Sequence, residues 1–165
     1  MVVVVVIGLL VGIFTLSIGA FSTDDGREEM RRLQTLLQMA SEEATMQGRD
    51  LGLQFYQSGY EFAARLPRTN KDGVQVWEWT PLDDDRLLRP RDLGENFRLE
   101  LELEDKEITL PYERESIKDY EPQVFLLSSG DIEPPFGLRL GTLSGSGYRI
   151  EVDADGEIQV TDDEF

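Results

Sequence analysis

The chain opens with an unbroken apolar segment. Residues 1–21 read MVVVVVIGLLVGIFTLSIGAF, in which Thr15 and Ser17 are the polar positions. As a helix, a segment of about 20 residues spans roughly 30 Å, the thickness of the hydrocarbon core of a bilayer. A helix that lies on a water-soluble domain shows a polar face, and this segment shows none. The pattern therefore predicts a membrane-spanning helix over residues 1–21.

Two alternatives for this segment stay open. A cleaved signal peptide could end at Ile18–Ala20, although no basic stretch stands ahead of the apolar run. A buried β-strand over Val2–Ile7 is the other alternative, although the apolar run continues far beyond the length of a strand. Gly8 and Gly12 form a small-xxx-small pair, which permits close approach of helices in a membrane.

A helical period of 3.6 residues continues over residues 22–48. The apolar side chains form one stripe about 120° wide, made by Met30, Leu33, Leu36, Leu37, Ala40 and Ala44. Ser22–Asp25 resembles a capping box, and Gly48 provides a stop. These signals predict an amphipathic helix over residues 22–48, which packs on the head domain through Leu33, Leu37, Ala40 and Ala44.

After Gly48 the period changes to two, which is typical of β-strands. Alternation and turn signals predict strands at Leu51–Phe55, Tyr60–Leu66, Val74–Trp79, Phe97–Leu103, Gln123–Leu127, Phe136–Leu140, Tyr148–Val152 and Glu157–Val160. Pro67–Gly73 and residues 80–96 are predicted as connections. The expected fold class is α+β, with one long N-terminal helix packed on an antiparallel, β-sheet-rich head over residues 49–165.

Composition excludes several kinds of chemistry. The chain has neither Cys nor His, so disulfides, thiolate sites and histidine-based catalysis cannot be built from it. The formal net charge is −17, and all charged residues follow residue 23. Because nucleic-acid affinity depends largely on Lys and Arg, we expect no nucleic-acid partner.

Four acidic or aromatic patterns are candidates for chemistry. Glu151-x-Asp153-x-Asp155-Gly156 approaches a calcium loop, but Asp155-Gly156 is also a hairpin signal, and an acidic hairpin is the favoured interpretation. Asp83–Asp85 is expected to be a solvated loop rather than a cation site or a contact for a basic partner. Three acidic side chains should share one exposed sheet face, namely Glu100, Glu102 and Glu104. Two tryptophans are expected to pack in the core or at a sheet edge rather than bind sugars, namely Trp77 and Trp79. We therefore expect no catalytic site, metal site or cofactor.

Several strings together resemble the minor pseudopilins of the H type in type II secretion, the GspH family, a branch shared with FimT-like minor pilins. The apolar run Val5–Gly12 is similar to VVIIGLLAG in that family. Other strings match in the same order: Ala40–Ala44 with Gly48–Leu53, Trp79–Arg89 (WTPLDDDRLLR), Leu126–Asp131 and Pro135–Leu140. Precursors in the family carry a basic leader and G-F-T-L-x-E before the apolar run, so we expect the natural start to lie upstream of Met1.

The resemblance implies a structural subunit of the pseudopilus, a short periplasmic filament that helps to export folded proteins across the outer membrane. Its implied partners are the other major and minor pseudopilins, the inner-membrane assembly platform and membrane lipid, with the head in the periplasm. The residues expected to lie in the membrane or in the filament core are Val5, Gly8, Leu9, Gly12 and Phe14. The alternative is a FimT-like pilin for DNA uptake or pilus assembly, which the net charge disfavours. A carboxylate-based or calcium-dependent enzyme is a third, weaker hypothesis.

Overall fold

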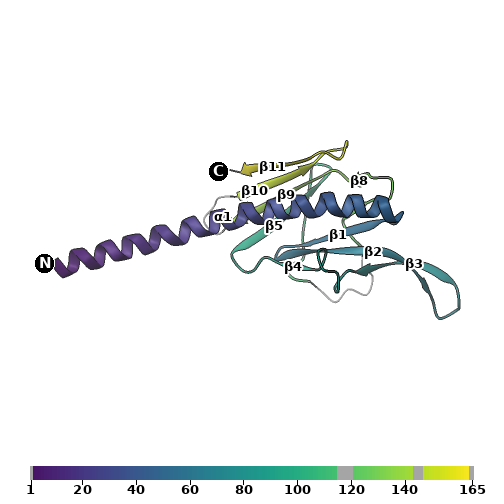
Figure 1. The fold of residues 1–165 in the computed structure, drawn as a ribbon, viewed down its shortest axis with the longest axis horizontal. Helices are drawn as coiled ribbons and strands as arrows, with labels where there is room; N and C mark the ends of the chain where they lie inside the picture. The colour runs from purple at the N-terminus through teal and green to yellow at the C-terminus, as the bar shows by residue number, and fades with distance from the viewer. Residues whose placement is uncertain (1, 115–120, 143–146, 164–165) are drawn as a thin grey trace.

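One continuous helix runs through the N-terminal part of the molecule. The computed structural model describes residues 2–114, 121–142 and 147–163, and side chains from Asp25 onward to Asp162 within these ranges. Helix α1 covers Val2–Gln47, and Figure 1 shows its first half extending beyond the sheets. At 1.5 Å per residue its 46 residues make it about 70 Å long. The helix does not begin at Ser22, because residues 22–25 continue the hydrogen-bonded turns that precede them.

The end of α1 lies where the sequence places it. Gly48 follows the helix with φ of 60°, a left-handed conformation that costs glycine little. The amide of Arg49 donates to the carbonyl of Ala44 at 3.1 Å, and the amide of Gly48 donates to the carbonyl of Thr45 at 3.3 Å. These bonds satisfy carbonyls of the last turn, and the chain then enters the first strand.

The first sheet, sheet A, is antiparallel and has the strand order β3-β2-β1-β7-β8, with β4 paired to β2. Its strands are β1 Leu51–Tyr56, β2 Gly59–Thr69, β3 Gln75–Pro81, β4 Arg91–Asp92, β7 Val124–Leu126 and β8 Ile132–Glu133. The predicted connection over Pro67–Gly73 is wrong in its first part. Strand β2 continues to Thr69 because β3 pairs with it as far as Gln75.

The second sheet, sheet B, is also antiparallel and has the order β11-β10-β9-β5-β6. Its strands are β5 Phe97–Leu103, β6 Lys106–Ile108, β9 Phe136–Thr142, β10 Gly147–Val152 and β11 Ile158–Asp163. The fold class is therefore as predicted, but the head holds two sheets. The short strands β4, β6 and β8 were not predicted, because two or three residues carry no readable period.

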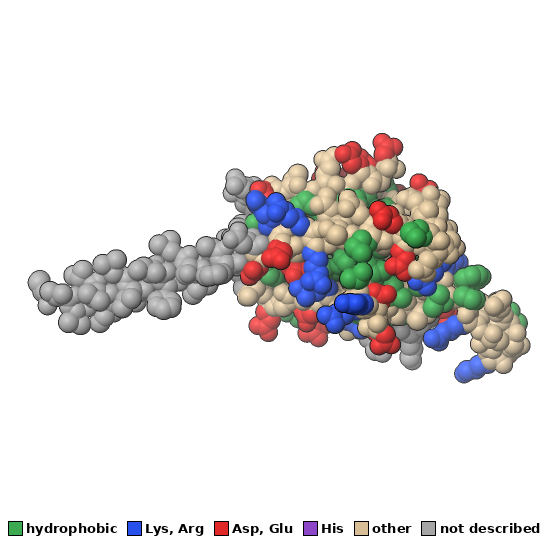
Figure 2. All heavy atoms as spheres, viewed as in Figure 1, with side chains coloured by type: hydrophobic (Ala, Val, Ile, Leu, Met, Phe, Trp, Pro, Cys, Tyr) green, Lys and Arg blue, Asp and Glu red, His purple; other side chains and the backbone are tan. Residues whose placement is uncertain are grey.

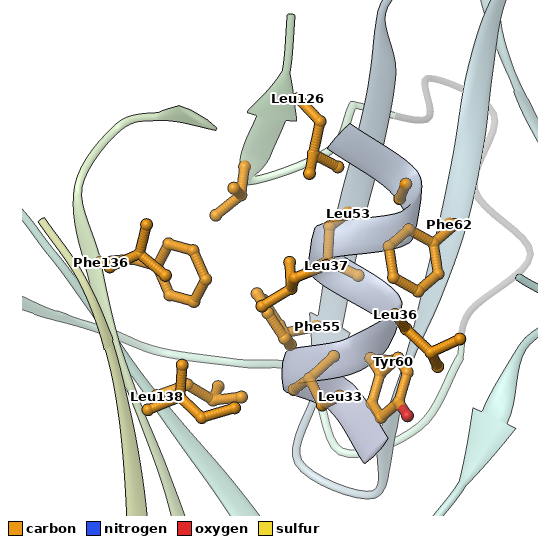
Figure 3. Close-up of a cluster of buried hydrophobic side chains, with 14 of the residues drawn as sticks. Leu33, Leu36, Leu37, Leu53, Phe55, Tyr60, Phe62, Leu126, Phe136 and Leu138 are labelled. Carbon is orange, nitrogen blue, oxygen red and sulfur yellow. The ribbon is translucent and has the colours of Figure 1, made fainter. Parts of the chain in front are cut away.

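The core lies where α1 meets the inner faces of both sheets. Figure 3 shows Leu33, Leu36 and Leu37 on the helix, with side chains of sheet A on one side and of sheet B on the other. The rings of Phe55 on sheet A and Phe136 on sheet B lie 5.9 Å apart between centroids. The helix is thus the common layer on which both sheets bury their apolar faces.

Candidate assembly surface

The first half of α1 carries the residues predicted to lie in the membrane or in the filament core. Val5, Gly8, Leu9, Gly12 and Phe14 belong to this half, and their side chains lie outside the described residues. Their roles therefore stay predictions, as does the boundary at residue 21. Over the residues whose side chains are described, no helix is long and apolar enough to cross a membrane.

The second half of α1 turns one face to the head. Leu33 is 1% exposed, and Leu37, Ala40 and Ala44 are fully buried. The small alanines at the end of the stripe let the helix approach the sheets closely. The opposite face is largely polar, and its exposed side chains include Arg31, Gln38, Met39, Glu42 and Met46.

A glycine fixes how closely α1 approaches sheet B at the point where the helix leaves the head. A Cβ atom at Gly26 would lie 3.0 Å from the Tyr148 ring and 3.3 Å from the Phe97 ring. Sequence reasoning did not select Gly26. Its signal was nonetheless present, because glycine inside a helix costs about 1 kcal/mol relative to alanine and often marks close packing.

Two ion pairs hold the same part of the helix to the head. Arg91, on β4, donates to both carboxylate oxygens of Glu29, and its Nε lies 3.2 Å from Glu29 Oε2. This hydrogen bonding raises the pKa of Arg91 above its ordinary value, and burial opposes the shift. Arg27 Nη2 lies 2.6 Å from Asp162 Oδ2 on β11. The helix is thereby tied to sheet A by one pair and to sheet B by the other, which sets the direction in which it leaves.

The outer face of sheet A, which points away from α1, carries a buried carboxylate. Glu61 is 1% exposed and accepts a hydrogen bond from the Tyr56 hydroxyl. Its Oε2 lies 2.5 Å from Arg114 Nε, and Arg114 Nη2 reaches Asp83 at 2.6 Å. Burial, followed by the bond to Glu61, raises the pKa of Tyr56 above its ordinary value. The predicted solvated loop Asp83–Asp85 is thus tied to the head by an ion pair.

Asp85, the last residue of the acidic run Asp83–Asp85, shapes the loop that follows β3. Asp85 Oδ1 accepts the amides of Leu87 and Leu88, both at 2.8 Å, and Leu88 is 2% exposed. The carboxylate therefore folds the chain so that Leu88 enters the core. This is the local role that an aspartate at the start of a turn often has.

The outer face of sheet B carries exposed ion pairs. Arg139 pairs with Glu100 at 2.8 Å, and Arg149 pairs with Glu102 at 2.5 Å and with Glu151 at 2.8 Å. Glu104 does not share this face as part of the strand, because β5 ends at Leu103 and Glu104 takes φ of 48° in the following turn. These carboxylates are paired with arginines across the strands, an arrangement that stabilises a sheet rather than one that transfers protons.

The acidic pattern at residues 151–156 covers the end of β10 and the hairpin turn that leads to β11. Asp153 Oδ1 accepts the amides of Asp155 at 3.0 Å and of Glu157 at 2.9 Å, and Gly156 has φ of 78°. The side chain of Asp153 is therefore used within the turn. Among the described residues, no three acidic side chains are grouped closely enough to hold a metal ion.

The two tryptophans of β3 differ in their surroundings. Trp79 is half-buried, and its ring lies 5.6 Å from the Phe125 ring between centroids. Trp77 is 62% exposed on β3, the edge strand of sheet A, so it does not pack in the core but lies at a sheet edge, the second of the two predicted places. The hairpin that β3 forms with β2 extends past the body of the head (Figure 1).

A sequence model of the family described as "Type II transport protein GspH" matches residues 29–156. Type II secretion system protein H of Pseudomonas aeruginosa is 30% identical over 167 residues, which cover 94% of this chain and 87% of that protein. The protein of the same name from Aeromonas hydrophila is 30% identical over 138 residues, which cover 80% of this chain and 72% of that protein.

Solved structures show the same fold. A crystal structure of the minor pseudopilin EpsH from the type II secretion system of Vibrio cholerae has a TM-score of 0.64 at 20% identity, with 84% of this chain and 96% of that chain covered. The solution structure of E. coli GspH has a TM-score of 0.59 at 22% identity, with 84% and 88% covered. With most of its length matched by the family and by relatives at 30% identity, the chain belongs to the GspH family of type II transport proteins.

Proposed function

We propose that this chain is a structural minor pseudopilin, which enters the type II secretion pseudopilus and helps to export folded proteins across the outer membrane. The observation that carries the proposal is the division of α1 into two halves. The second half supports both sheets with a buried stripe, whereas the first half extends beyond the head (Figure 1). The sequence of that first half is apolar from Val2 to Phe21.

The same helix can serve in two environments. Before assembly, residues 1–21 anchor the chain in the inner membrane, with the head in the periplasm. After assembly, these residues pack against the helices of neighbouring pseudopilins, and Gly8 and Gly12 permit close approach. In both states the apolar side chains stay away from water, so transfer from lipid to filament has a small hydrophobic cost. The inner-membrane assembly platform would bring the subunits together.

The proposal includes no catalytic role and no cofactor. The chain contains no Cys or His, and the acidic clusters of the head are engaged in turns and ion pairs. Binding to nucleic acid is not proposed either, because the formal net charge of −17 opposes approach to a phosphate backbone. A subunit of this kind acts through its shape and contacts.

The test follows incorporation and secretion in a bacterium whose own H-type subunit has been deleted. The chain is expressed behind a pilin-type leader, as wild type, as Gly8→Leu and as the matched control Val4→Leu. Wild type and the control should resist carbonate extraction from membranes and restore secretion. Gly8→Leu should stay in the membrane but lower secretion about tenfold or more, because the larger side chain separates the helices.

Two results would contradict the proposal. One is a wild-type chain that carbonate releases from the membrane without cleavage. The other is salt-sensitive binding of the purified chain to double-stranded DNA at micromolar affinity, together with no pseudopilin contact, which would favour the FimT-like alternative.

A further inference from the structure

The hairpin of β2 and β3 extends past the body of the head. Figure 1 shows it beyond the C-terminal end of α1, on the side of the molecule opposite the N-terminus. Pairing continues along it from Ala63↔Pro81 to Thr69↔Gln75. We call its outer part, residues 65–77, the arm.

The tip of the arm has a defined conformation. Asn70 Oδ1 accepts the amides of Asp72 at 3.0 Å and of Val74 at 2.9 Å. The amide of Asn70 donates to the carbonyl of Val74 at 2.8 Å, and Gly73 takes φ of 77°. The arm therefore presents its side chains in a fixed arrangement, which lowers the entropy lost when it binds a partner.

Large apolar side chains of the arm are exposed. Trp77 is 62% exposed and Val74 is 56% exposed, and Pro67, opposite Trp77 in the register, is also exposed. Neighbouring Trp79 shows the contrast, because it packs on Phe125 where the sheet is covered. An exposed tryptophan on a rigid element is the kind of residue that contributes most at protein interfaces.

The arm is basic on an acidic protein. It carries three cations, Arg65, Arg68 and Lys71, and one carboxylate, Asp72, whereas the whole chain has a formal net charge of −17. Arg65 lies 3.8 Å from Asp50 and Arg68 lies 3.8 Å from Glu78, and both guanidinium groups are at least half exposed. Figure 2 shows basic and apolar side chains together at this projecting end.

We propose that the arm docks on the carboxylate-rich face of a neighbouring pseudopilin subunit, with Trp77 as its apolar anchor and Arg68 and Lys71 as its charged contacts. This inference rests on the proposed function, since it names the surface through which the head meets its neighbour. A membrane surface would also attract tryptophan and basic residues, but the arm lies at the end of the molecule remote from the apolar half of α1 (Figure 1). A carboxylate-rich protein surface is therefore the occupant that fits its charge and position.

The experiment uses photo-crosslinking in the bacterium described above. The full chain, behind the same leader, carries a photoreactive phenylalanine analogue at position 77, at position 9 or at position 112. Position 9 reports packing of the helix in the filament, and Tyr112 is a matched aromatic outside the arm that is 47% exposed. We expect an adduct with another pseudopilin from positions 77 and 9, and at least about tenfold less from position 112.

Charge reversal then tests the stated chemistry. Arg68→Glu with Lys71→Glu should lower the adduct from position 77 about tenfold, whereas Lys106→Glu, an exposed cation on β6, should leave it unchanged. Protease resistance of each variant shows that the head has folded.

The outcomes distinguish a failure of docking through the arm from a failure of the proposed pseudopilin function. An adduct from position 9 but none from position 77 would overturn the arm and leave the proposed function intact. No pseudopilin adduct from either position would contradict the proposed function itself. Adducts from position 77 to lipid or to a secreted protein would also overturn the docking proposal, as would insensitivity to charge reversal.

Discussion

The two sheets meet α1 in the same way but differ on their outer faces. On the inner side both bury apolar residues against the helix stripe, as Figure 3 shows. On the outer side, sheet A carries a buried carboxylate, Glu61, which is 1% exposed. Sheet B carries Glu100 on its outer face, with a side chain that is 55% exposed. Both carboxylates pair with arginine, so the same chemical pair occurs in two settings.

We therefore expect that cover, more than residue type, sets how much each ion pair contributes to the free energy of unfolding. Pro122 lies so close to Gly52 that a Cβ atom there would overlap its ring, and Arg114 lies on Glu61. These two residues cover the outer face of sheet A at Gly52 on β1 and at Glu61 on β2. A buried carboxylate must keep its donors or lose much stability, whereas an exposed carboxylate can turn to water instead. The following changes test this comparison.

The largest loss in the free energy of unfolding is expected from a change in the buried stripe of α1, which both sheets contact. Leu37→Ala should lower the free energy of unfolding by about 2–5 kcal/mol, because a fully buried side chain leaves a cavity between the two sheets. Urea melts of a fragment beginning at residue 25 provide the measurement. Glu42→Ala, on the exposed face of α1, should cost about 0.5 kcal/mol or less. Equal losses would show that the helix register is wrong.

A second change addresses Tyr60, which is 2% exposed and lies in the apolar layer between α1 and sheet A. Burial, followed by the nearby charge of Glu29, raises the pKa of Tyr60 to about 12. Because the unfolded chain releases this proton near pH 10, the wild type should lose stability as the pH rises from 10 to about 12. Tyr60→Phe should remove about 2–3 kcal/mol of that loss.

The measurement is a pair of melting series from pH 8 to pH 12. At pH 8 both states of the wild type keep the proton, so the variant and the wild type should differ little there. Parallel curves for the two proteins above pH 10 would contradict the assignment, because they would place the alkaline loss in other groups.

The ion pair of the buried Glu61 on sheet A should show an intermediate effect on the free energy of unfolding. Glu61→Gln keeps the size of the side chain but removes the charge that faces Arg114 and Tyr56, and should cost about 1–3 kcal/mol. Asp83 is the other partner of Arg114, and its side chain is 56% exposed. Asp83→Asn should therefore lower the free energy of unfolding by about 0.5 kcal/mol or less. If both variants lost the same stability, burial would not be the reason for the difference between the faces.

The sequence predicted the features that depend on a local period. The stripe from Met30 to Ala44 and the alternation in Phe97–Leu103 each repeat within a single element, and the structure has a helix and a strand at these residues. Gly48 was readable as a helix stop for the same reason. The predicted membrane residues and their roles in assembly stay predictions.

Features that depend on distant segments were not readable. Alternation at Leu51, Leu53 and Phe55 suggested a strand with one polar face, yet β1 is buried throughout because Pro122 and its neighbours cover the other side. Glu61 and Arg114 are 53 positions apart, so no spacing rule joins them. The exposure of Trp77 likewise depends on where the hairpin extends beyond the core, which the strand pattern does not show.

The smallest effect is expected on the open face of sheet B. Glu100→Gln removes one partner of the 2.8 Å ion pair with Arg139, but the Glu100 side chain is 55% exposed and its charge is screened by water and salt. The variant should lose about 0.5 kcal/mol or less in urea melts at low salt, and less at 0.5 M salt. Glu61→Gln should keep most of its loss at both salt concentrations, because salt screens an ion pair with a buried carboxylate much less than an exposed pair. A large, salt-resistant loss at Glu100 would mean that something covers the outer face of sheet B as well, and the two sheets would then differ less than their exposures indicate.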